Sequence, residues 1–358
     1  MNQNHTLETY GFTPFYEKQI TEEENKAGLI PARVINIQKE TYQIVSEHGS
    51  KLAKLKSTCF YNNSEFVTYP AVGDFVLVRY NELGDDLIYR VLDRKSSFTR
   101  KNPSVLNISN SMEQVVASNF DYILIATSLN QDYNPRRIER YLATAWQTNA
   151  TPVIVLTKAD LMTEDIDLSA LSEVAAGLYL FTFSSVTGEV IDELRSFLKP
   201  QKTYAITGSS GIGKSSLLNA LSGEELMKVN NIREDDAKGR HTTTYRQLFA
   251  LSSGALFIDT PGMRELQILD VEDGLKASFQ ELIELAQNCR FSDCSHESEP
   301  GCAVKKAIED GELSMERFLS YKKLQKESAH AALKATILQN KVNNYAKKMR
   351  KQYQTRAK

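Results

Sequence analysis

The sequence has few cysteines and no long apolar run. Four cysteines in 358 residues are too few for a disulfide scaffold in a chain of this length. The N-terminus lacks a basic segment followed by an apolar run, so no secretory signal is expected. No apolar stretch is long enough to span a membrane. These absences predict a cytoplasmic protein without a membrane partner.

A large net charge is also lacking, since the formal charge is −2 at pH 7. This value hides an asymmetry: residues 321–358 carry eleven Lys and Arg against one acid, Glu327. This segment therefore has a charge of +10, and the first 320 residues together have a charge of −12. The chain thus has a basic tail on an acidic body. Such a tail can bind a polyanion, or it can be a solvated helix or a frayed end; charge alone leaves both interpretations open.

The length fits two or three domains. In the first part, five short runs read as strands separated by turn residues. Five short strands in about 65 residues are typical of a small barrel such as an OB-fold, although an SH3-like barrel would look similar. The runs are Arg33–Ile37, Tyr42–Ser46, Leu52–Leu55, Phe75–Tyr80 and Leu87–Leu92.

The pattern changes after a polar stretch. Buried apolar runs now alternate with helix-like segments such as Arg136–Gln147 and Lys214–Leu221, which predicts a parallel sheet covered on both faces. Ligands of such α/β domains bind at the loops that follow the strands. The expected strands are Tyr122–Ala126, Pro152–Leu156, Leu178–Phe183, Thr203–Thr207 and Ala255–Ile258.

A phosphate-binding motif follows one of these strands and opens a helix. It fits G-x-x-x-x-G-K-[ST], in which glycines let successive N–H groups face phosphate oxygens. Lys214 is expected to reach the β- and γ-phosphates, and the Ser215 hydroxyl to bind Mg²⁺. The expected binding residues are Gly208, Ser209, Ser210, Gly211, Ile212, Gly213, Lys214, Ser215 and Ser216.

A base-specificity motif, Thr157, Lys158, Ala159 and Asp160, follows an earlier strand. A carboxylate can accept two hydrogen bonds side by side. Guanine offers two adjacent donors, its ring N1–H and its exocyclic amine, whereas adenine does not offer this pair. Asp160 therefore selects guanine, while the stem of Lys158 can cover one face of the base. After a further strand, the backbone of Ser184 and Ser185 can support the base from the other side, although a plain strand-to-helix turn would look the same.

Two segments have the character of γ-phosphate switches. In the sequence DTPG, Asp259 is expected in the Mg²⁺ shell, and the Gly262 N–H is expected to bond the γ-phosphate. In the sequence GRHTTT upstream, we expect Thr243, rather than Thr242, to complete the Mg²⁺ shell.

The position after Gly262 holds Met263, which cannot orient the attacking water as a Gln would. We hypothesise that His241 positions this water and that Lys214 and Thr243 are the other catalytic residues. His241 can equally be a plain loop residue. Without a dedicated group, unaided hydrolysis should be slow and accelerated by a partner.

The motifs run in permuted order: the guanine motif precedes the phosphate loop and both switches. A parallel sheet tolerates this order because the site depends on strand ends. Beyond the second switch, Cys289, Cys294, His296 and Cys302 give the spacing C-x₄-C-x-H-x₅-C. Three thiolates and one imidazole match a closed structural zinc site, worth about 10–16 kcal/mol of apparent binding energy.

Over about residues 28–320, the chain resembles the ribosome-small-subunit-dependent GTPase family RsgA (YjeQ/YloQ). The resemblance rests on the combination and order of TKAD, GSSGIGKSS, GRHTTT, DTPG and the Cys/His cluster. The resemblance implies GTP with Mg²⁺, one structural Zn²⁺, late maturation of the 30S subunit, hydrolysis stimulated by that subunit, and contact with 16S rRNA. We expect a monomer.

The expected architecture is multidomain. Its segments are an N-terminal extension (1–27), an OB-like β-barrel (28–95), a linker (96–111), a circularly permuted α/β P-loop GTPase domain (112–269), a zinc-binding module (270–320) and a basic helical tail (321–358). Two other functions stay open: a permuted GTPase of the large subunit or another RNA, and a nonenzymatic RNA-binding scaffold that holds GTP. Asp160 disfavours an ATPase.

Overall fold

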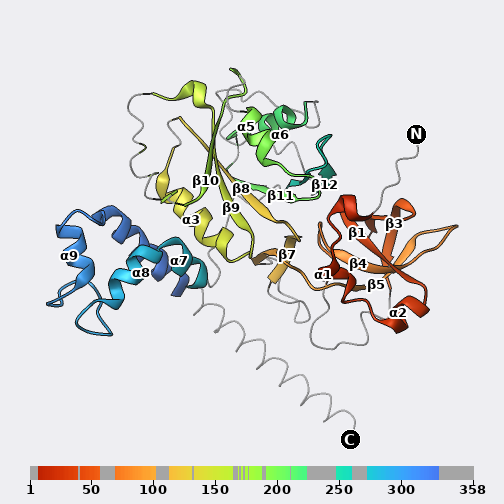
Figure 1. Cartoon of the computed structure of the whole chain (residues 1–358), viewed down its shortest axis with the longest axis horizontal. Coiled ribbons are helices and arrows are strands. Elements are labelled where there is room, and N and C mark those ends of the chain that lie inside the picture. Colours follow the sequence, from red (N-terminus) through yellow and green to blue (C-terminus); the bar gives the residue numbers. More distant parts are fainter. Residues whose placement is uncertain are drawn as a thin grey trace, which may run out of the picture. The chain divides into compact units, whose positions relative to one another are not determined.

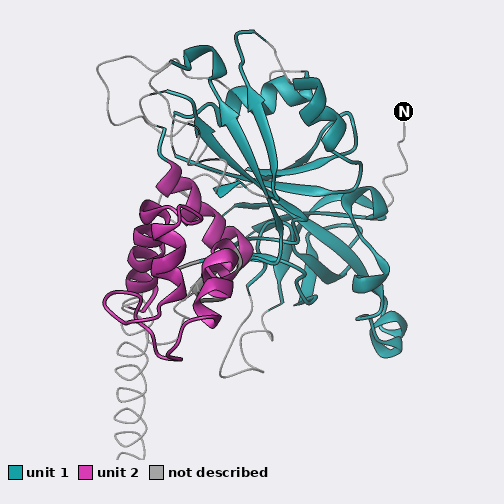
Figure 2. Ribbon diagram, turned by 60° about the vertical axis from the view of Figure 1, so that its left-hand side comes forward, with its two compact units in different colours: residues 1–102, 111–134, 148–266 teal, residues 103–110, 135–147, 267–358 magenta. Residues whose placement is uncertain are grey.

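The computed structural model describes residues 7–38, 41–56, 69–101, 113–130, 133–163, 168, 171, 174–175, 177–187, 191–209, 211–223, 247–259 and 272–329. The chain divides into two compact units, teal and magenta in Figure 2. Unit 1 comprises Met1–Asn102, Ser111–Asn134 and Thr148–Leu266; unit 2 comprises Pro103–Asn110, Pro135–Gln147 and Gln267–Lys358. Each unit is therefore assembled from segments that are distant in sequence.

Unit 1 begins with a closed five-stranded barrel. Its strands are β1 (Leu29–Gln38), β2 (Thr41–Ser46), β3 (Gly49–Leu55), β4 (Phe75–Arg79) and β5 (Asp86–Val91), in the spatial order β1-β2-β3-β5-β4. β1 also pairs with β4, which closes the barrel, and β3 runs parallel to β5. All five predicted strands are confirmed, and the Greek-key order is that of an OB-like barrel.

A short N-terminal segment packs against the barrel. It contains η1 (Leu7–Tyr10), α1 (Pro14–Glu17) and α2 (Glu22–Lys26). Thr21 begins α2 in a capping box with Glu24, and Arg90 of β5 binds the same carboxylate at 2.5 Å. Apolar side chains of this segment share a core with barrel residues: Leu7, Tyr16, Leu29, Phe75, Leu77 and Leu92.

The second part of unit 1 is the nucleotide-domain sheet (Figure 1). Its strands are β8 (Tyr122–Ser128), β9 (Thr151–Thr157), β10 (Tyr179–Phe183), β11 (Thr203–Thr207), β12 (Gln247–Ala250) and β13 (Leu256–Asp259), in the order β10-β9-β8-β11-β13-β12. The first five in this order are parallel, as predicted, and β12 is antiparallel to β13. α5 (Ile191–Phe197) and α6 (Lys214–Ser222) contribute Leu194 and Leu218 to the apolar core of this sheet.

Three strands have no clear signal in the sequence, because they are short or polar. One is β12, and the other two are β6 (Ser97–Lys101) and β7 (Glu113–Ser118), which pair antiparallel in a separate two-stranded sheet. β6 lies at the start of the stretch expected as a linker, 96–111. It therefore continues regular structure from the barrel toward the nucleotide domain.

β1 is shared between the barrel and the nucleotide-domain sheet. Up to Arg33 it pairs with β4, and a β-bulge just before Asn36 then shifts its register against β2. A bulge bends a strand and increases its twist, and beyond this one Asn36 pairs antiparallel with Gln247 of β12. The buried Arg33 guanidinium donates to the carbonyl oxygens of Gly73 and Asn119, at 3.2 and 2.9 Å, and so ties the barrel to the chain entering β8.

Unit 2 is helical in the described residues. It contains α3 (Pro135–Trp146), α7 (Glu272–Ser278), α8 (Gln280–Gln287), α9 (Ala303–Glu309) and a helix over 315–329. α3 lies between β8 and β9 in the chain, yet it packs with the helices that come after the sheet. A Cβ on Gly274 of α7 would lie 2.0 Å from the carbonyl oxygen of Ala143 in α3, so this close approach requires glycine.

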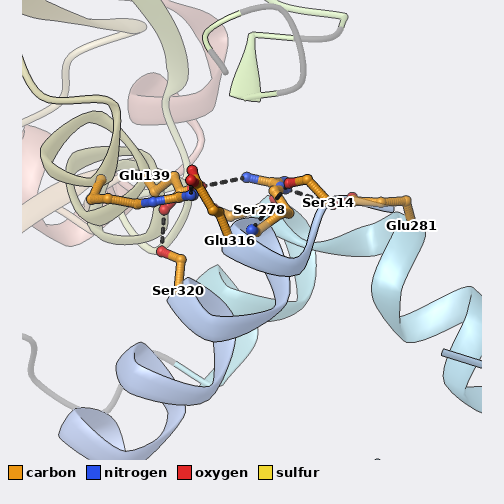
Figure 3. A network of polar contacts seen from close by, with 8 residues as sticks. Glu139, Ser278, Glu281, Ser314, Glu316 and Ser320 are labelled. Carbon is orange, nitrogen blue, oxygen red and sulfur yellow. Dashed lines mark hydrogen bonds and ion pairs between the residues drawn. The ribbon is translucent and has the colours of Figure 1, made fainter. Parts of the chain in front are cut away.

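A buried ionic network joins α3 to the other helices of unit 2 (Figure 3). Glu139 is fully buried and binds Arg136 at 2.8 Å and Arg317 at 3.2 Å, while the Ser320 hydroxyl donates to its second oxygen. Arg317 also binds Glu281 of α8 at 2.8 Å. Burying a charge without partners costs folding free energy, and these ion pairs and the hydrogen bond offset that cost. The network therefore holds α3 within unit 2.

Glu24→Gln is expected to lower the free energy of unfolding at pH 7 by about 1–2 kcal/mol, because it removes a charge-assisted hydrogen bond. The side-chain hydrogen bond from Arg90 lowers the pKa of Glu24 from 4.5 to about 2. A carboxylate whose pKa is lowered by folding stabilises the fold above pH 4.5, and this contribution is lost as the pH falls toward 2. The difference between variant and wild type in denaturant midpoint should shrink over this range.

Glu22→Gln is the matched control, since Glu22 lies in the same helix with a side chain that is 90% exposed. It should change the denaturant midpoint little at any pH. Equal losses in both variants, or a loss in Glu24→Gln that does not depend on pH, would contradict the prediction.

Candidate functional site

Five parallel strands present their carboxyl ends at one edge of the sheet. The chain passes from β8 to β9 and β10 on one side, and then adds β11 and β13 on the other side of β8. The direction of strand addition therefore reverses between β8 and β11, and open α/β sheets bind ligands at such a switch point. The strands end at Ser128, Thr157, Phe183, Thr207 and Asp259.

The phosphate loop lies at this switch point, between β11 and α6. Gly208 has a φ of 145°, and a Cβ there would lie 2.5 Å from the carbonyl oxygen of Ala126 in β8. Gly213, with a φ of 96°, is the N-cap residue of α6. Nζ of Lys214 donates to the carbonyl oxygens of Gly208 and Ser209, both at 2.8 Å. Lys214 thus lies across the loop, where a P-loop lysine binds phosphate.

The other predicted residues of the loop are also near the start of α6. Gly211 is exposed with a φ of 75°, Ile212 is buried, and Ser215 and Ser216 lie in the first turn of the helix. The backbone N–H groups of a helix N-terminus favour an anion. Ser210 lies outside the described residues.

The guanine motif directly contacts the phosphate loop. Thr157, at the end of β9, is 1% exposed, and its hydroxyl donates to the carbonyl oxygen of Ile212 at 2.5 Å. Lys158 follows in the left-handed region, with a φ of 56°, and Ala159 and Asp160 form the short helix η3 (Ala159–Leu161). Asp160 is exposed. Two motifs some fifty residues apart in the sequence are therefore joined at one edge of the sheet.

Ser184 orients the Asp160 carboxylate. Its fully buried hydroxyl donates to Oδ1 of Asp160 and accepts the N–H groups of Val186 and Thr187 at 3.1 and 3.2 Å. Ser185 is an exposed residue of the same turn. The sequence suggested only a backbone role for Ser184 and Ser185. A buried serine that ends a strand and begins a turn is the signal that could have indicated the side-chain role.

The switch residues are only partly described. Asp259, the last residue of β13, is 6% exposed and pairs with Ile206 of β11, two residues before the phosphate loop. Its carboxylate is therefore at the edge where the predicted Mg²⁺ shell requires it. His241, Thr243 and Gly262 lie outside the described residues, and their roles stay predictions.

Unit 2 contains a group of four metal-ligating side chains: Cys289, Cys294, His296 and Cys302, whose ligand atoms all lie within 4.8 Å of one another. Nδ1 of His296 is 3.6 Å from Sγ of Cys289 and 3.4 Å from Sγ of Cys302, and these two sulfurs are 3.9 Å apart. Tetrahedral zinc with usual bond lengths requires ligand separations of about 3.5–3.8 Å. The four predicted ligands are thus placed to hold one metal ion, with separations that suit zinc.

The surrounding chain fixes these ligands. Cys302 is the N-cap residue of α9, and its sulfur accepts a backbone N–H of the first turn at 3.4 Å. The Glu299 carboxylate accepts the N–H and hydroxyl of Ser295, between the ligands. Burial, followed by the charge of Lys322, lowers the pKa of His296. A neutral imidazole is the form that binds a metal.

One edge of a parallel sheet thus carries a phosphate loop, a guanine motif and an aspartate suited to Mg²⁺, with the guanine motif first in the chain. This arrangement defines a circularly permuted P-loop GTPase. The model of the RsgA GTPase family matches residues 91–269. The chain belongs to this family and is a GTPase.

Curated relatives match over most of the chain. "Small ribosomal subunit biogenesis GTPase RsgA 2" of Listeria monocytogenes is 46% identical over 331 residues, which are 92% of this chain and 91% of the relative. The protein of the same name from Lactiplantibacillus plantarum is 41% identical over 331 residues, again 92% and 91% of the two chains.

Two solved structures share the fold. YjeQ from Thermotoga maritima matches with a TM-score of 0.64 and 30% identity, covering 84% of this chain and 99% of that one. YloQ, described as a circularly permuted GTPase, matches with a TM-score of 0.58 and 24% identity, covering 84% and 96%. Both likenesses extend well beyond the nucleotide domain.

A model of ABC transporters also matches, over residues 191–351. This stretch contains the phosphate loop, the motif that ATP- and GTP-binding P-loop proteins share, but not the guanine motif at 157–160. In the part of the chain that the structure describes, no helix has the length and apolar character needed to cross a membrane.

Thr157→Val is expected to lower the affinities for GTP and GDP by about five- to tenfold, because the carbonyl oxygen of Ile212 loses its buried donor. The preference for GTP over ATP should persist, since Asp160 is unchanged. Fluorescence titration with labelled nucleotides measures both quantities.

Two further variants test the assignment. Thr151→Val, at the exposed start of the same strand, should leave both affinities unchanged. Asp160→Ala should instead reduce the discrimination against ATP. Wild-type affinity in Thr157→Val would show that the contact between the two loops does not contribute to nucleotide binding.

Cys302→Ser is expected to abolish binding of one metal ion per chain and to lower Tm, because a tetrahedral site with three ligands binds zinc much more weakly. Elemental analysis of the purified chain and thermal unfolding with and without a chelator measure these effects. Cys59→Ser, far from the cluster in sequence, is the control and should keep the metal. A full equivalent of zinc in Cys302→Ser would refute the ligand assignment.

Proposed function

We propose that this chain binds the 30S ribosomal subunit and hydrolyses GTP in the late maturation of that subunit. The bound subunit stimulates the hydrolysis. The observation that carries the nucleotide part is the bond between Thr157 and Ile212, by which the guanine and phosphate motifs share one site. The partner is supported by relatives 41–46% identical over nine-tenths of the chain, whose names describe small-subunit biogenesis.

Contact with 16S rRNA is part of the proposal. OB-folds bind oligonucleotides through one face of the barrel in many proteins. The charge of +10 on residues 321–358 suits a polyanion, since each phosphate contact releases counterions. We propose a monomer that acts in the cytoplasm.

Each part of the site has a proposed role. Lys214 neutralises charge on the β- and γ-phosphates, and Asp160 selects the base. Ser215, Thr243 and Asp259 hold the Mg²⁺, which stabilises negative charge on the transferred phosphoryl group when it is bound. His241 positions the attacking water. The four ligands of unit 2 hold one structural zinc ion.

The decisive measurement is multiple-turnover release of phosphate from GTP, with and without purified 30S subunits, across salt concentrations. Turnover should rise by at least about tenfold with 30S, because an external group completes the catalytic site. The stimulation should weaken steadily as salt rises, since salt screens the contacts with RNA.

The alternatives give different results in the same assay. Stimulation by 50S but not by 30S would identify a permuted GTPase of the large subunit. Binding of GTP without turnover under any condition would identify a scaffold. A His241→Ala variant with wild-type stimulated turnover and nucleotide affinity would remove His241 from the mechanism and leave the rest intact.

A further inference from the structure

Three neighbouring strands of the barrel, β3, β5 and β4, have one face that points away from the barrel core. Ala53, Ile88 and Val78, one from each strand, are buried in that core. Successive side chains of a strand point to opposite faces, so the residues next to these three point outward. On β4, the outward residues Phe75 and Leu77 share a core with the N-terminal segment, which therefore covers this part of the face.

The rest of the outer face carries exposed side chains. Lys54 of β3 pairs with Leu87 of β5, and Leu87 pairs with Arg79 of β4, so the three lie in one row across the strands. Leu87 is 39% exposed, and Leu52, two residues before Lys54, is 50% exposed. This outer face therefore combines exposed apolar side chains with basic ones.

Two cations approach the ring of Tyr89, which follows this row on β5. Nζ of Lys56 is 3.9 Å from the ring centre, and Cζ of Arg79 is 5.1 Å from it. Attraction to the π-electrons of the ring holds each cation near it. The two positive charges are therefore at most about 9 Å apart. Like charges at this separation repel each other, and a bound anion would relieve the repulsion.

The two cations have no acidic partner among the residues that the structure describes. The carboxylate of Asp85, on the same side of the barrel, binds Lys54 at 2.8 Å. Arg79 donates to the carbonyl oxygen of Ala27 at 3.5 Å, which leaves most of its five N–H donors for other acceptors. Lys56 and Arg79 thus keep their charge for a ligand, whereas the charge of Lys54 is already compensated.

We propose that Lys56 and Arg79 bind neighbouring phosphates of single-stranded RNA, and that Leu52 and Leu87 contact its bases. The inference rests on the proposed contact with 16S rRNA and assigns that contact to this face. Phosphates follow one another closely along a strand, so two of them can contact cations with this spacing. The bases of a single strand can turn toward an apolar surface, which the stacked bases of a duplex cannot do.

The test is binding of a fluorescently labelled single-stranded RNA of about 12 nucleotides to the full chain, measured by anisotropy across salt concentrations. Lys56→Gln and Arg79→Gln should each weaken binding about three- to fivefold at physiological salt. Each should also reduce the slope of log K against log salt by about 0.7, because one phosphate contact is lost. The double variant should reduce the slope by about 1.4. The basic tail contributes equally in all variants.

Lys18→Gln is the matched control, since it removes the same charge from an exposed residue of the N-terminal segment. It should leave the affinity for RNA and the salt slope at the wild-type values. Tm and the affinity for GTP should be unchanged in every variant, because the substituted side chains lie at the surface of the barrel. A wild-type slope in the double variant, or an equal loss in Lys18→Gln, overturns the proposal.

Turnover of GTP with 30S subunits separates this inference from the proposed function. If 30S stimulates the wild type and the double variant binds RNA with the wild-type slope, the proposed function stands and this RNA site fails alone. If 30S does not stimulate the wild type but the double variant shows the reduced slope, the RNA site stands and the proposed function fails. Loss of 30S binding with unchanged RNA binding would assign the face to a protein partner and overturn the inference.

Discussion

The hydroxyl of Thr157 connects the two motifs that make a guanine-nucleotide site. It donates to the carbonyl oxygen of Ile212, so the end of β9 is held to the phosphate loop across the intervening strand β8. Ser184 fixes Asp160 on the other side of β9. We propose that recognition of the base and binding of the phosphates depend on this connection, because each loop by itself would hold only one part of the nucleotide.

Permutation leaves this site intact and changes its surroundings. The strands that carry the motifs keep their places in the sheet, because a site at strand ends depends on spatial order and not on chain order. Chain order instead decides which element comes after each strand. β8 leads into α3, which a buried network holds within unit 2, and the chain beyond β13 leads into the same unit. Two strands of the nucleotide sheet are thus covalently connected to the module with the metal-ligating cluster.

The barrel is likewise part of the nucleotide domain's structure. β1 belongs to both sheets, and Arg33 binds carbonyl oxygens from the barrel and from the chain before β8. The guanidinium is fully buried, and burial, the largest influence, lowers its pKa to about 10. It remains a cation at neutral pH, so its carbonyl acceptors must stay in place. The boundary between the barrel and the sheet is therefore held by defined hydrogen bonds from one buried arginine.

The motifs, the alternation of strands and helices, and the four metal-ligating residues could be predicted from the amino-acid sequence, because they depend on residue type and short spacing. Gly208 and Lys214 are examples, since both act within one loop. Three contacts become evident only in the folded chain: Ser184 binds Asp160, Asn36 pairs with Gln247 across two strands, and α3 packs with helices more than a hundred residues later in the sequence. Such partners depend on strand order, register and burial across the whole chain, and no local pattern of residues encodes them.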